Sequence, residues 1–391
     1  MSAATIEPIV NIEFADSLSA VSAAEWNSVA GTDYPFTRHE FLNNLEQSGC
    51  ADRDSGWHSQ HLLVRRDELL IAVMPLYLKY HSYGEYVFDW SWADAYRRHG
   101  IPYYPKLLGA IPFTPATGPR LCVAAGENAD AIASQIIAAL RDRMERANIS
   151  SLHILFPQPE LRSALLQAGL SERTGVQYHW FNDNFSSFDD FLATFSSRKR
   201  KNLRKERARI AEQELGLRVL EGSDITTEHW QLFHRFYAMT YAKLSGHAGY
   251  LNEVFFQSLG AQLCEHMVMT LAYWRGEAVA GALYFRDSTT LYGRYWGCVR
   301  EFDCLHFEAC YYQGIEYCIR NGLQHFDPGA QGEHKIQRGF APIKTFSYHW
   351  IKEDAFHAAI EQFLQHEQHE LDAYIEQARA LLPFKQCGAP S

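Results

Sequence analysis

A loop near the end of the chain gathers side chains that suit proton transfer and the stabilisation of negative charge. Gly332 is followed directly by Glu333, His334 and Lys335, and Arg338 lies three residues further on. Glu333 or His334 could accept a proton, and Lys335 or Arg338 could hold an oxyanion or a phosphate. Polar loops of this kind are also often only solvated surface, so both interpretations stand at this point.

Three more polar side chains occur beside aromatic residues that are expected in strands. Arg294 lies beside Tyr292, and Glu85 occupies the matching position of a similar stretch earlier in the chain. Opposite charges at matching positions predict a ligand pocket, unless Arg294 points to solvent by strand alternation. Asp89 follows the earlier stretch, where it either holds an amine as a catalytic group or caps a helix over residues 91–98.

The positive charge of the chain is concentrated in one segment. Eight residues between Arg198 and Arg209 are basic and only Glu206 is acidic, whereas the whole chain has a formal net charge of −10. Like charges repel unless something neutralises them, so the segment predicts a site for a nucleotide diphosphate or a tRNA backbone. It could also be the exposed face of a helix that continues to Glu212, with Leu203 and Ile210 inward. The candidate anion-binding residues are Lys199, Arg200, Arg204 and Lys205.

Length and composition indicate a globular chain of two domains. It has 391 residues, of which 47% are hydrophobic and 21% charged, enough to bury a sizeable core. The net charge argues against a protein that coats nucleic acid, so we expect no DNA partner. No apolar run approaches the length of a membrane span and residues 1–20 lack a secretory pattern, which predicts a cytoplasmic protein without membrane insertion.

Motifs of several other enzyme classes and of metal sites are missing from the sequence. It contains no Gly-x-Ser-x-Gly elbow, no phosphate-cradling Gly-Lys-Ser/Thr loop and no His-Glu-x-x-His helix, so hydrolase, NTPase and zinc-protease functions are not supported. The eight cysteines are interpreted as buried thiols, because they lack the two-residue spacing of zinc ligands. We therefore expect no metal.

An internal repeat predicts the architecture. Residues 61–79 and 270–288 align without a gap at a separation of 209 positions, and each predicts a strand, a tight polar turn and a second strand. At the same separation, residues 83–86 match residues 292–295 in a Tyr-Gly-x-Tyr pattern, which predicts a third strand in each half. Helical periodicity follows in both halves, over 129–147 and 307–319.

The predicted order is therefore helix, three-stranded meander, helix and strand, twice over. The last strands are Ser151–Phe156 and His325–Asp327, and an amphipathic helix over Asp354–Leu382 follows. A duplicated order of this kind is typical of layered α/β domains. We expect domains at residues 1–183 and 184–391, because an Asn-Asp-Asn-Phe-Ser-Ser stretch there interrupts the periodicity. The basic segment would open the second domain.

Three stretches resemble motifs of the FemAB-like branch of the GNAT acyltransferase superfamily. Residues 197–205, followed later by Gly216, are similar to the family's run of Arg, Asn-Ile-Arg-Lys and a later Gly. Residues 112–119 resemble its Pro-x-Gly-Pro loop, and residues 335–340 resemble its Lys-x-Gly-Phe segment. The chain is still more similar to predicted N-acyltransferases concerned with peptidoglycan biosynthesis or recognition, through residues 55–57, 81–90 and 328–335.

The resemblance implies a fold and a reaction. The fold is α/β, with two tandem GNAT-like domains of mixed, mainly antiparallel sheets flanked by helices. The reaction is N-acyl transfer, in which an amine of a small molecule or cell-wall precursor directly attacks the acyl or aminoacyl group of the donor. The donor would be an aminoacyl-tRNA or an acyl-CoA. A silent module that binds muropeptides or a nucleotide-linked ligand is the alternative from another class.

Two departures from the family pattern concern the donor and the cation. Members that use CoA hold its pyrophosphate with a glycine-containing loop after the third meander strand, but residues 89–96 and 298–308 contain no glycine. This argues against acetyl-CoA as the donor. Gln337 stands where the family has its lysine. Lys335 and Arg338 therefore remain alternative substrate-binding cations, beside the candidates Arg294, Tyr292 and Glu85.

Overall fold

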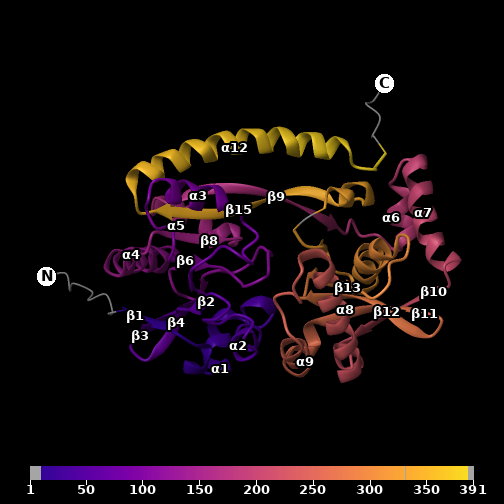
Figure 1. Cartoon of the computed structure of the whole chain (residues 1–391), viewed down its shortest axis with the longest axis horizontal. Coiled ribbons are helices and arrows are strands. Elements are labelled where there is room, and N and C mark those ends of the chain that lie inside the picture. The colour runs from indigo at the N-terminus through magenta and orange to yellow at the C-terminus, as the bar shows by residue number, and fades with distance from the viewer. Residues whose placement is uncertain (1–9, 331, 386–391) are drawn as a thin grey trace. The chain divides into compact units, whose positions relative to one another are not determined.

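The computed structural model describes residues 10–330 and 332–385 of the chain (Figure 1). The chain forms two compact units, each made of two stretches of sequence. Unit 1 comprises the residues up to Thr174 together with Phe346–Gln368, and unit 2 comprises Gly175–Thr345 together with the residues from His369 onward. No described helix is both long enough and apolar enough to cross a membrane.

Unit 2 is built on a mixed sheet with the strand order β10, β11, β12, β13, β14, β9. Neighbouring strands are antiparallel except β13 and β14, which run parallel. This parallel pair spans only three positions, from Thr290 opposite His325 to Tyr292 opposite Asp327. The strands are β9 (Ser171–Phe181), β10 (Leu215–Glu221), β11 (Met267–Trp274), β12 (Glu277–Arg286), β13 (Thr290–Cys298) and β14 (His325–Asp327).

Helices cover both faces of this sheet, because alternate residues of β12 point to opposite sides. Gly281 approaches Phe233 on one side, whereas the Tyr284 hydroxyl donates to the Ala309 carbonyl on the other. The first side carries α8 (Thr227–Ser245) and α9 (Glu253–Gln262), and the second carries α10 (Leu305–Phe307), a π-helical segment (Glu308–Tyr312) and α11 (Gln313–Asn321). The remaining helices of unit 2 are α6 (Phe188–Ala193) and α7 (Ser197–Glu212).

Unit 1 has the same strand order, but its strands are interrupted. β2 with β3, β4 with β5, and β6 with β7 take the places of β11, β12 and β13, and β6 runs parallel to β8 as β13 does to β14. The strands are β1 (Val10–Ala15), β2 (Trp57–Ser59), β3 (His61–Arg66), β4 (Leu69–Met74), β5 (Tyr77–Lys79), β6 (Lys106–Gly109), β7 (Cys122–Val123), β8 (Ser151–Leu155) and β15 (Ala341–Ile351).

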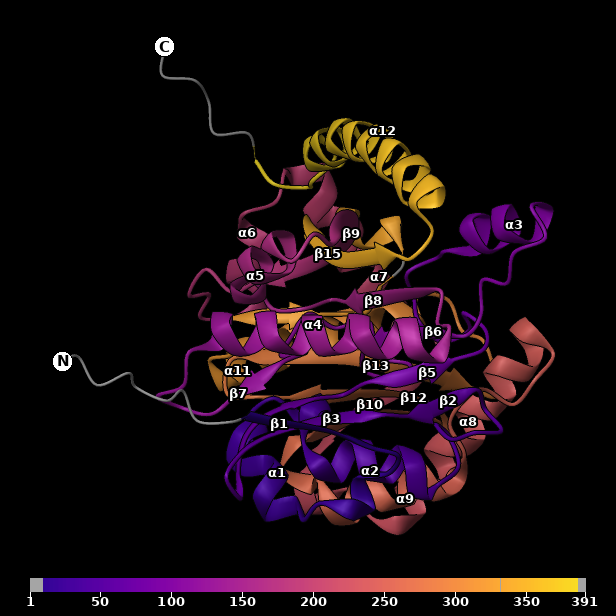
Figure 2. The same cartoon turned by 90° about the vertical axis from the view of Figure 1, so that its left-hand side faces the viewer.

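The core of unit 1 forms between its sheet and α4 (Ala129–Ala147) (Figure 2). Ile132, Ile136 and Leu140 of this helix are buried, which confirms the helix and the inward face that the apolar spacing predicted. The other helices of unit 1 are α1 (Ala23–Ala30), α2 (His39–Gln47), α3 (Trp90–Arg98) and α5 (Arg162–Gln167), and α12 (Asp354–Ala380) starts in unit 1 and ends in unit 2.

The two hairpins of the repeat are present, but their separation is 208 positions and not 209. The turn residues Asp67 and Glu68 correspond to Arg275 and Gly276, since β3 ends at 66 and β11 at 274. Each hairpin also has an irregularity in its register, between residues 64 and 65 in one and 272 and 273 in the other. A slip of one residue exchanges the two faces of a strand, so the predicted pairing of individual residues was wrong.

The predicted third strand of the first half is also wrong. Residues 83–86 form turns, with Gly84 and Tyr86 in the left-handed region at φ 80° and 62°. They belong to an excursion, residues 80–105, that connects β5 to β6, whereas unit 2 joins β12 to β13 through residues 287–289 alone. The counterpart of β13 is therefore β6 with β7, and Glu85 does not match Arg294.

The last strand of each sheet comes from the other half of the sequence. β9 follows α5 of unit 1 in the chain but pairs with β14, and β15 follows the unit 2 loop after β14 but pairs with β8. The predicted domain boundary lies between residues 183 and 184. The compact units differ from it in two ranges, because residues 175–183 belong to unit 2 and residues 346–368 to unit 1. As a division between folding domains, that boundary stays a prediction.

We expect Gly297→Ala to lower the free energy of unfolding by about 1–3 kcal/mol through overpacking. A Cβ at Gly297 would lie 2.2 Å from the backbone of Phe236 in α8, so β13 and α8 would have to separate. Gly216→Ala in β10 is the matched control, because a Cβ at Gly216 would lie in open space, with no contact within 4 Å. Urea unfolding measures both, and equal effects would contradict the close α8–β13 contact.

Candidate active site

A pocket of about 440 Å³ opens in unit 2 where β13 diverges from β14. We call it the β13 pocket. At its floor the register between β12 and β13 passes from Tyr295 to Gly293 and skips Arg294, which marks a β-bulge. Its wall includes Tyr284 of β12, residues 293–296 of β13, His306, Cys310 and Tyr311, and residues 328–330, Gly332, His334 and Lys335.

Lys335 is a buried cation that faces this pocket. Its residue is 2% exposed, and its ammonium donates to the Gly329 carbonyl at 2.6 Å. Across residues 10–330 and 332–385, no carboxylate lies within ion-pair distance of this ammonium. Burial is the main cause that lowers the pKa of Lys335, to about 8, although Asp327 acts in the opposite direction. The lysine is therefore charged at neutral pH but close to losing its proton.

A buried ion pair between Arg294 and Asp327 lies next to Lys335. Arg294 Nη2 lies 2.5 Å from Asp327 Oδ2, and the two side chains are 2% and 1% exposed. Asp327 Oδ1 also accepts the Gly329 N–H at 2.9 Å, so it fixes the residue whose carbonyl holds Lys335. Burial opposes ionisation of Asp327, but the charges of Arg294 and His179 and the hydrogen bonds from Arg294 and Gly329 together outweigh it and lower the pKa of Asp327. The interpretation of Arg294 as a solvent-facing side chain was wrong.

His334 lines the β13 pocket as a neutral side chain, and Glu333 does not line it. His334 Nε2 lies 2.9 Å from the Tyr311 hydroxyl, and burial, followed by the charges of Arg338 and Lys335, lowers the pKa of His334. Gly332 makes room for the ring, since a Cβ there would lie 2.5 Å from His334 Cε1. Glu333 is exposed and accepts the Tyr374 hydroxyl at 2.6 Å.

Arg338 is directed away from the pocket. Its guanidinium donates to Glu206 of α7 at 2.8 Å and lies 3.4 Å from the centre of the Phe307 ring. Gln337, which stands at the family's lysine position, accepts a hydrogen bond from Lys199. Of the two alternative cations, Lys335 therefore lines the pocket, whereas Arg338 links α7 to the rest of unit 2 through Glu206.

Tyr292 lies next to the site and not in it. Its hydroxyl donates to Asp287 Oδ2 at 2.6 Å, and its ring centre lies 5.3 Å from the Arg294 guanidinium carbon. The residue is absent from the pocket wall. Its place among substrate-binding residues remains a prediction.

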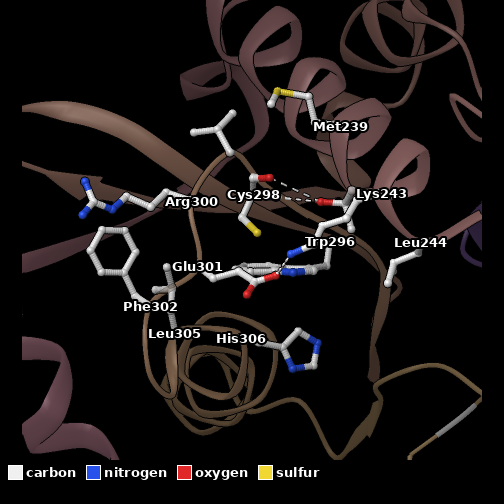
Figure 3. A pocket seen from close by; sticks show the side chains of 12 residues that line it. Met239, Lys243, Leu244, Trp296, Cys298, Arg300, Glu301, Phe302, Leu305 and His306 are labelled. Atoms are coloured by element: carbon white, nitrogen blue, oxygen red, sulfur yellow. Dashed lines mark hydrogen bonds and ion pairs between the residues drawn. The ribbon is translucent and has the colours of Figure 1, made fainter. Parts of the chain in front are cut away.

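A second pocket, of about 670 Å³, adjoins the first and was not expected from the sequence. We call it the α8 pocket. Figure 3 shows the Trp296 ring between the α8 side chains and His306, and these two residues line both pockets. The rest of its wall is Met239, Thr240, Lys243 and Leu244 of α8, with Cys298 to Phe302 and Leu305. The segment 298–308 that lacks glycine therefore forms a pocket wall.

The basic helix α7 has an inward face and a groove on its surface. Leu203 and Ile210 are buried, which confirms the predicted inward face. Some of the charges are neutralised within unit 2, because Arg204 pairs with Asp189 and Arg207 with Glu308 and Glu316. The groove, of about 400 Å³, is lined by Ser197, Arg200, Lys201, Arg204, Lys205 and Ala208. Lys199 does not line it.

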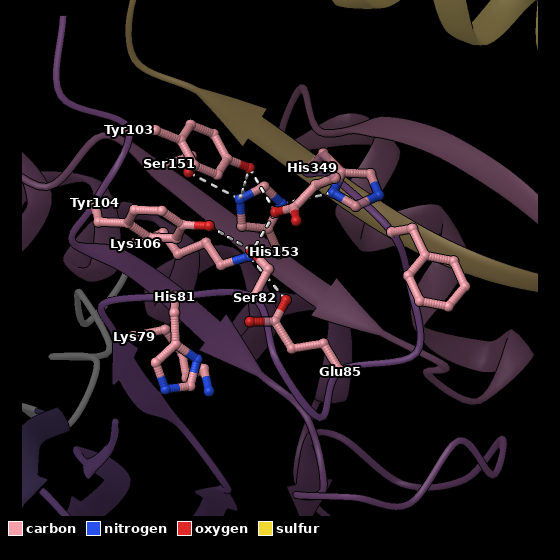
Figure 4. Close-up of polar contacts among 12 residues, drawn as sticks. Lys79, His81, Ser82, Glu85, Tyr103, Tyr104, Lys106, Ser151, His153 and His349 are labelled. Atoms are coloured by element: carbon pink, nitrogen blue, oxygen red, sulfur yellow. Dashed lines mark hydrogen bonds and ion pairs between the residues drawn. The ribbon is translucent and has the colours of Figure 1, made fainter. Parts of the chain in front are cut away.

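Asp89 and Glu85 lie in unit 1, around a lysine that the sequence did not single out. Figure 4 shows the Lys106 ammonium between Ser82 and Glu85. The ammonium lies 2.8 Å from Ser82 Oγ, 2.8 Å from Glu85 Oε2 and 2.5 Å from Asp89 Oδ2. Asp89 stands at the start of α3 but makes no side-chain cap bond. Asp89 is thus the N-cap residue of α3, but its side chain contacts Lys106 and does not cap the helix.

Burial and charge separate the two carboxyls of this cluster. Burial raises the pKa of Glu85 to about 7. For Asp89 the charges of Lys106 and His153 and the hydrogen bonds from Lys106 and Ser82 together outweigh burial and lower the pKa to about 2. The Tyr103 hydroxyl donates to Asp89 at 2.7 Å, and His153 and His349 continue the chain of polar contacts, their Nδ1 atoms 2.6 Å apart. Neither Asp89 nor Glu85 lines the β13 or the α8 pocket.

Metal-ligating side chains do not gather in the described part of the chain. Among residues 10–330 and 332–385, no group of three or more His, Cys, Asp or Glu side chains could hold a metal ion. The seven cysteines within these ranges are free thiols.

Comparison with known proteins defines the class and then the family. The structure of FemX is 12% identical, with a TM-score of 0.53, over 87% of this chain and 98% of that one. L-PGS from Bacillus licheniformis is 11% identical (TM-score 0.49, 82% and 93% covered), and a tandem GNAT protein from the clavulanic acid pathway is 9% identical (TM-score 0.44, 88% and 98% covered).

The fold is thus α/β with two tandem units of the same strand order and is similar to that of FemX. The family model for FemAB-like proteins, described as peptidoglycan biosynthesis/recognition, matches residues 17–386. The chain belongs to this family. No curated protein matches the sequence.

Proposed function

We propose that this protein is an N-acyltransferase whose reaction takes place in the β13 pocket. It transfers an acyl or aminoacyl group to an amine of a small molecule or a cell-wall precursor. The observation that carries the proposal is Lys335, a buried ammonium without an acidic partner in the described part of the chain, facing a pocket beside the neutral His334. The family's description supports an acceptor from peptidoglycan precursors.

The pocket residues suit direct attack on the donor. The amine nitrogen bonds to the acyl carbon, and the carbonyl oxygen becomes an oxyanion that the Lys335 ammonium stabilises. His334 accepts the proton that the nitrogen loses, because its lowered pKa keeps the ring neutral at pH 7. Collapse of the tetrahedral intermediate then breaks the bond to the donor's leaving group, the thiol of CoA or the ribose hydroxyl of tRNA, which receives a proton.

The α8 pocket and the α7 groove could bind the part of the donor that carries the acyl group, which is CoA or tRNA. The α8 pocket meets the β13 pocket at Trp296 and His306, so a carrier lying there would present its acyl group beside Lys335. The basic groove of α7 offers Arg200, Lys201 and Lys205 to phosphates. Both donors and the wall precursors are made in the cytoplasm, where we place the reaction.

The test offers labelled aminoacyl-tRNA and labelled acyl-CoA to the purified full chain, each with a panel of amines. We expect one donor class to give an amide product. Binding of the donors without turnover of either would contradict the transferase and favour a binding module.

The rate should depend on pH through the two pocket groups. We expect kcat/KM to rise as His334 loses its proton, at a pKa below the usual value of a histidine, and to fall near pH 8 as Lys335 loses its proton. Lys335→Arg should remove the fall on the alkaline side, because arginine stays charged. An alkaline limb that persists unchanged in this variant would show that Lys335 is not the titrating group.

A further inference from the structure

The charged side chains that line the β13 pocket have one sign. They are Arg294 and Lys335, whereas burial lowers the pKa of His306 and of His334 and keeps both rings neutral at pH 7. Among the described lining residues there is no Asp or Glu. Asp327, whose charge acts on Lys335, is 1% exposed and already holds Arg294 and the Gly329 N–H. A positively charged group of a substrate would find no carboxylate on this wall.

Lys335 lacks the counter-charge that a buried ammonium normally has. An ammonium carries three donors, and Gly329 accepts one of them at 2.6 Å. A buried charge without a partner is costly, and an anion placed against it removes that cost. One remaining donor can serve the reaction's oxyanion and the other a second anionic group. Tyr295, Trp296 and Tyr311 supply apolar wall for the carbon chain between them.

We propose that the β13 pocket binds a carboxylate of the substrate and rejects a free ammonium next to the reacting carbonyl. The inference rests on the proposed function, which places the reaction in this pocket. It narrows the donor, since an aminoacyl group with a free α-ammonium would lie against Lys335 and Arg294. The carboxylate belongs either to the acyl group or to the acceptor, as in an amino acid that offers its side-chain amine.

Binding of three small probes of equal length tests the charge preference without any turnover. We expect hexanoate to raise the melting temperature and to bind more tightly than hexanamide, and hexylamine to cause no shift. In Lys335→Met, hexanoate should bind about tenfold more weakly, as for loss of a hydrogen bond to a charged group. Lys344→Met is the matched control, because Lys344 is 42% exposed and pairs with Asp372 outside the pocket.

Two further measurements distinguish loss of the carboxylate site from misfolding of the variant and from hexanoate binding at another site. Lys335→Arg keeps the charge and should retain hexanoate binding. In the wild type, NMR of labelled lysine should show the pKa of Lys335 rising when hexanoate is bound. Hexylamine binding as tightly as hexanoate would overturn the proposal. So would hexanoate binding that survives Lys335→Met but is lost in Lys205→Met, which alters the α7 groove.

Turnover then identifies the source of the carboxylate. The donor arm compares glutaryl-CoA with pentanoyl-CoA, and the acceptor arm compares lysine with cadaverine, its decarboxylated form. A preference for glutaryl-CoA assigns the carboxylate to the acyl group, and a preference for lysine assigns it to the acceptor. Amide formation without either preference overturns this inference but leaves the transferase. Hexanoate binding with no turnover of any pair, and none with either donor class across the amine panel, overturns the transferase but leaves the carboxylate site.

Discussion

Lys335→Met should lower kcat/KM for acyl transfer by about 10²–10³-fold, the loss typical of removing one group that stabilises an oxyanion. The substitution keeps the length and the apolar stem of the side chain, so the pocket retains its shape. It removes the one ammonium in the pocket wall that no carboxylate of the described chain neutralises. Steady-state kinetics with the donor and amine found by the substrate screen measure the effect.

Stability should not fall in the same variant, because a buried charge without an ion pair is replaced by an apolar group. Urea unfolding checks this and separates a chemical role from a structural one. Arg338→Met is the informative comparison: it breaks the contact to Glu206 that fastens α7, so we expect lost stability as its main effect. If kcat/KM of the Lys335→Met variant is not lowered, another group and not Lys335 stabilises the oxyanion.

Asp327→Asn should lower the free energy of unfolding by about 3–5 kcal/mol, since it leaves the Arg294 charge buried without its partner. The amide keeps the shape and one hydrogen-bond acceptor, so the loss reports the charge. The carboxylate also raises the pKa of Lys335, and we therefore expect the alkaline limb of the rate profile to move to lower pH. Urea unfolding at pH 7 and the pH–rate profile measure the two effects.

Asp189→Asn is the matched control for this variant. Asp189 pairs with Arg204 on the surface and its side chain is 77% exposed, so the same substitution should change stability by less than about 0.5 kcal/mol. The pH dependence has a definite sign. The pKa of Asp327 is lowered by folding, so its contribution is present above the pKa of the unfolded chain, about 4, and disappears in stronger acid. If both variants unfold alike, the buried pair is not what stabilises the pocket.

The excursion between β5 and β6 explains why the two units carry different polar centres. In unit 1 it supplies Glu85 and Asp89 to Lys106 of β6. In unit 2 the corresponding turn is only residues 287–289, and Arg294 of β13 pairs instead with Asp327 at the end of the parallel strand. The same strand order thus gives a closed, buried cluster in unit 1 and a cation next to an open pocket in unit 2.

Local patterns in the sequence were enough to predict several elements. The helices α4 and α7 and their buried faces and the two hairpins were all predicted. These features depend on neighbours within a few positions, through side-chain periodicity, turn geometry and helix caps. The motif resemblance gave the tandem GNAT-like fold and the family.

Contacts between distant residues decided the rest. Periodicity could not show that β9 and β15 each pair with a strand from the other half of the sequence, or that residues 83–86 form turns. Nor could it choose between Lys335 and Arg338, because the choice depends on Glu206 of α7, which holds Arg338 away from the pocket. Burial and charge pairing depend on which side chains folding brings together, so only the tertiary structure determined which cation faces the pocket.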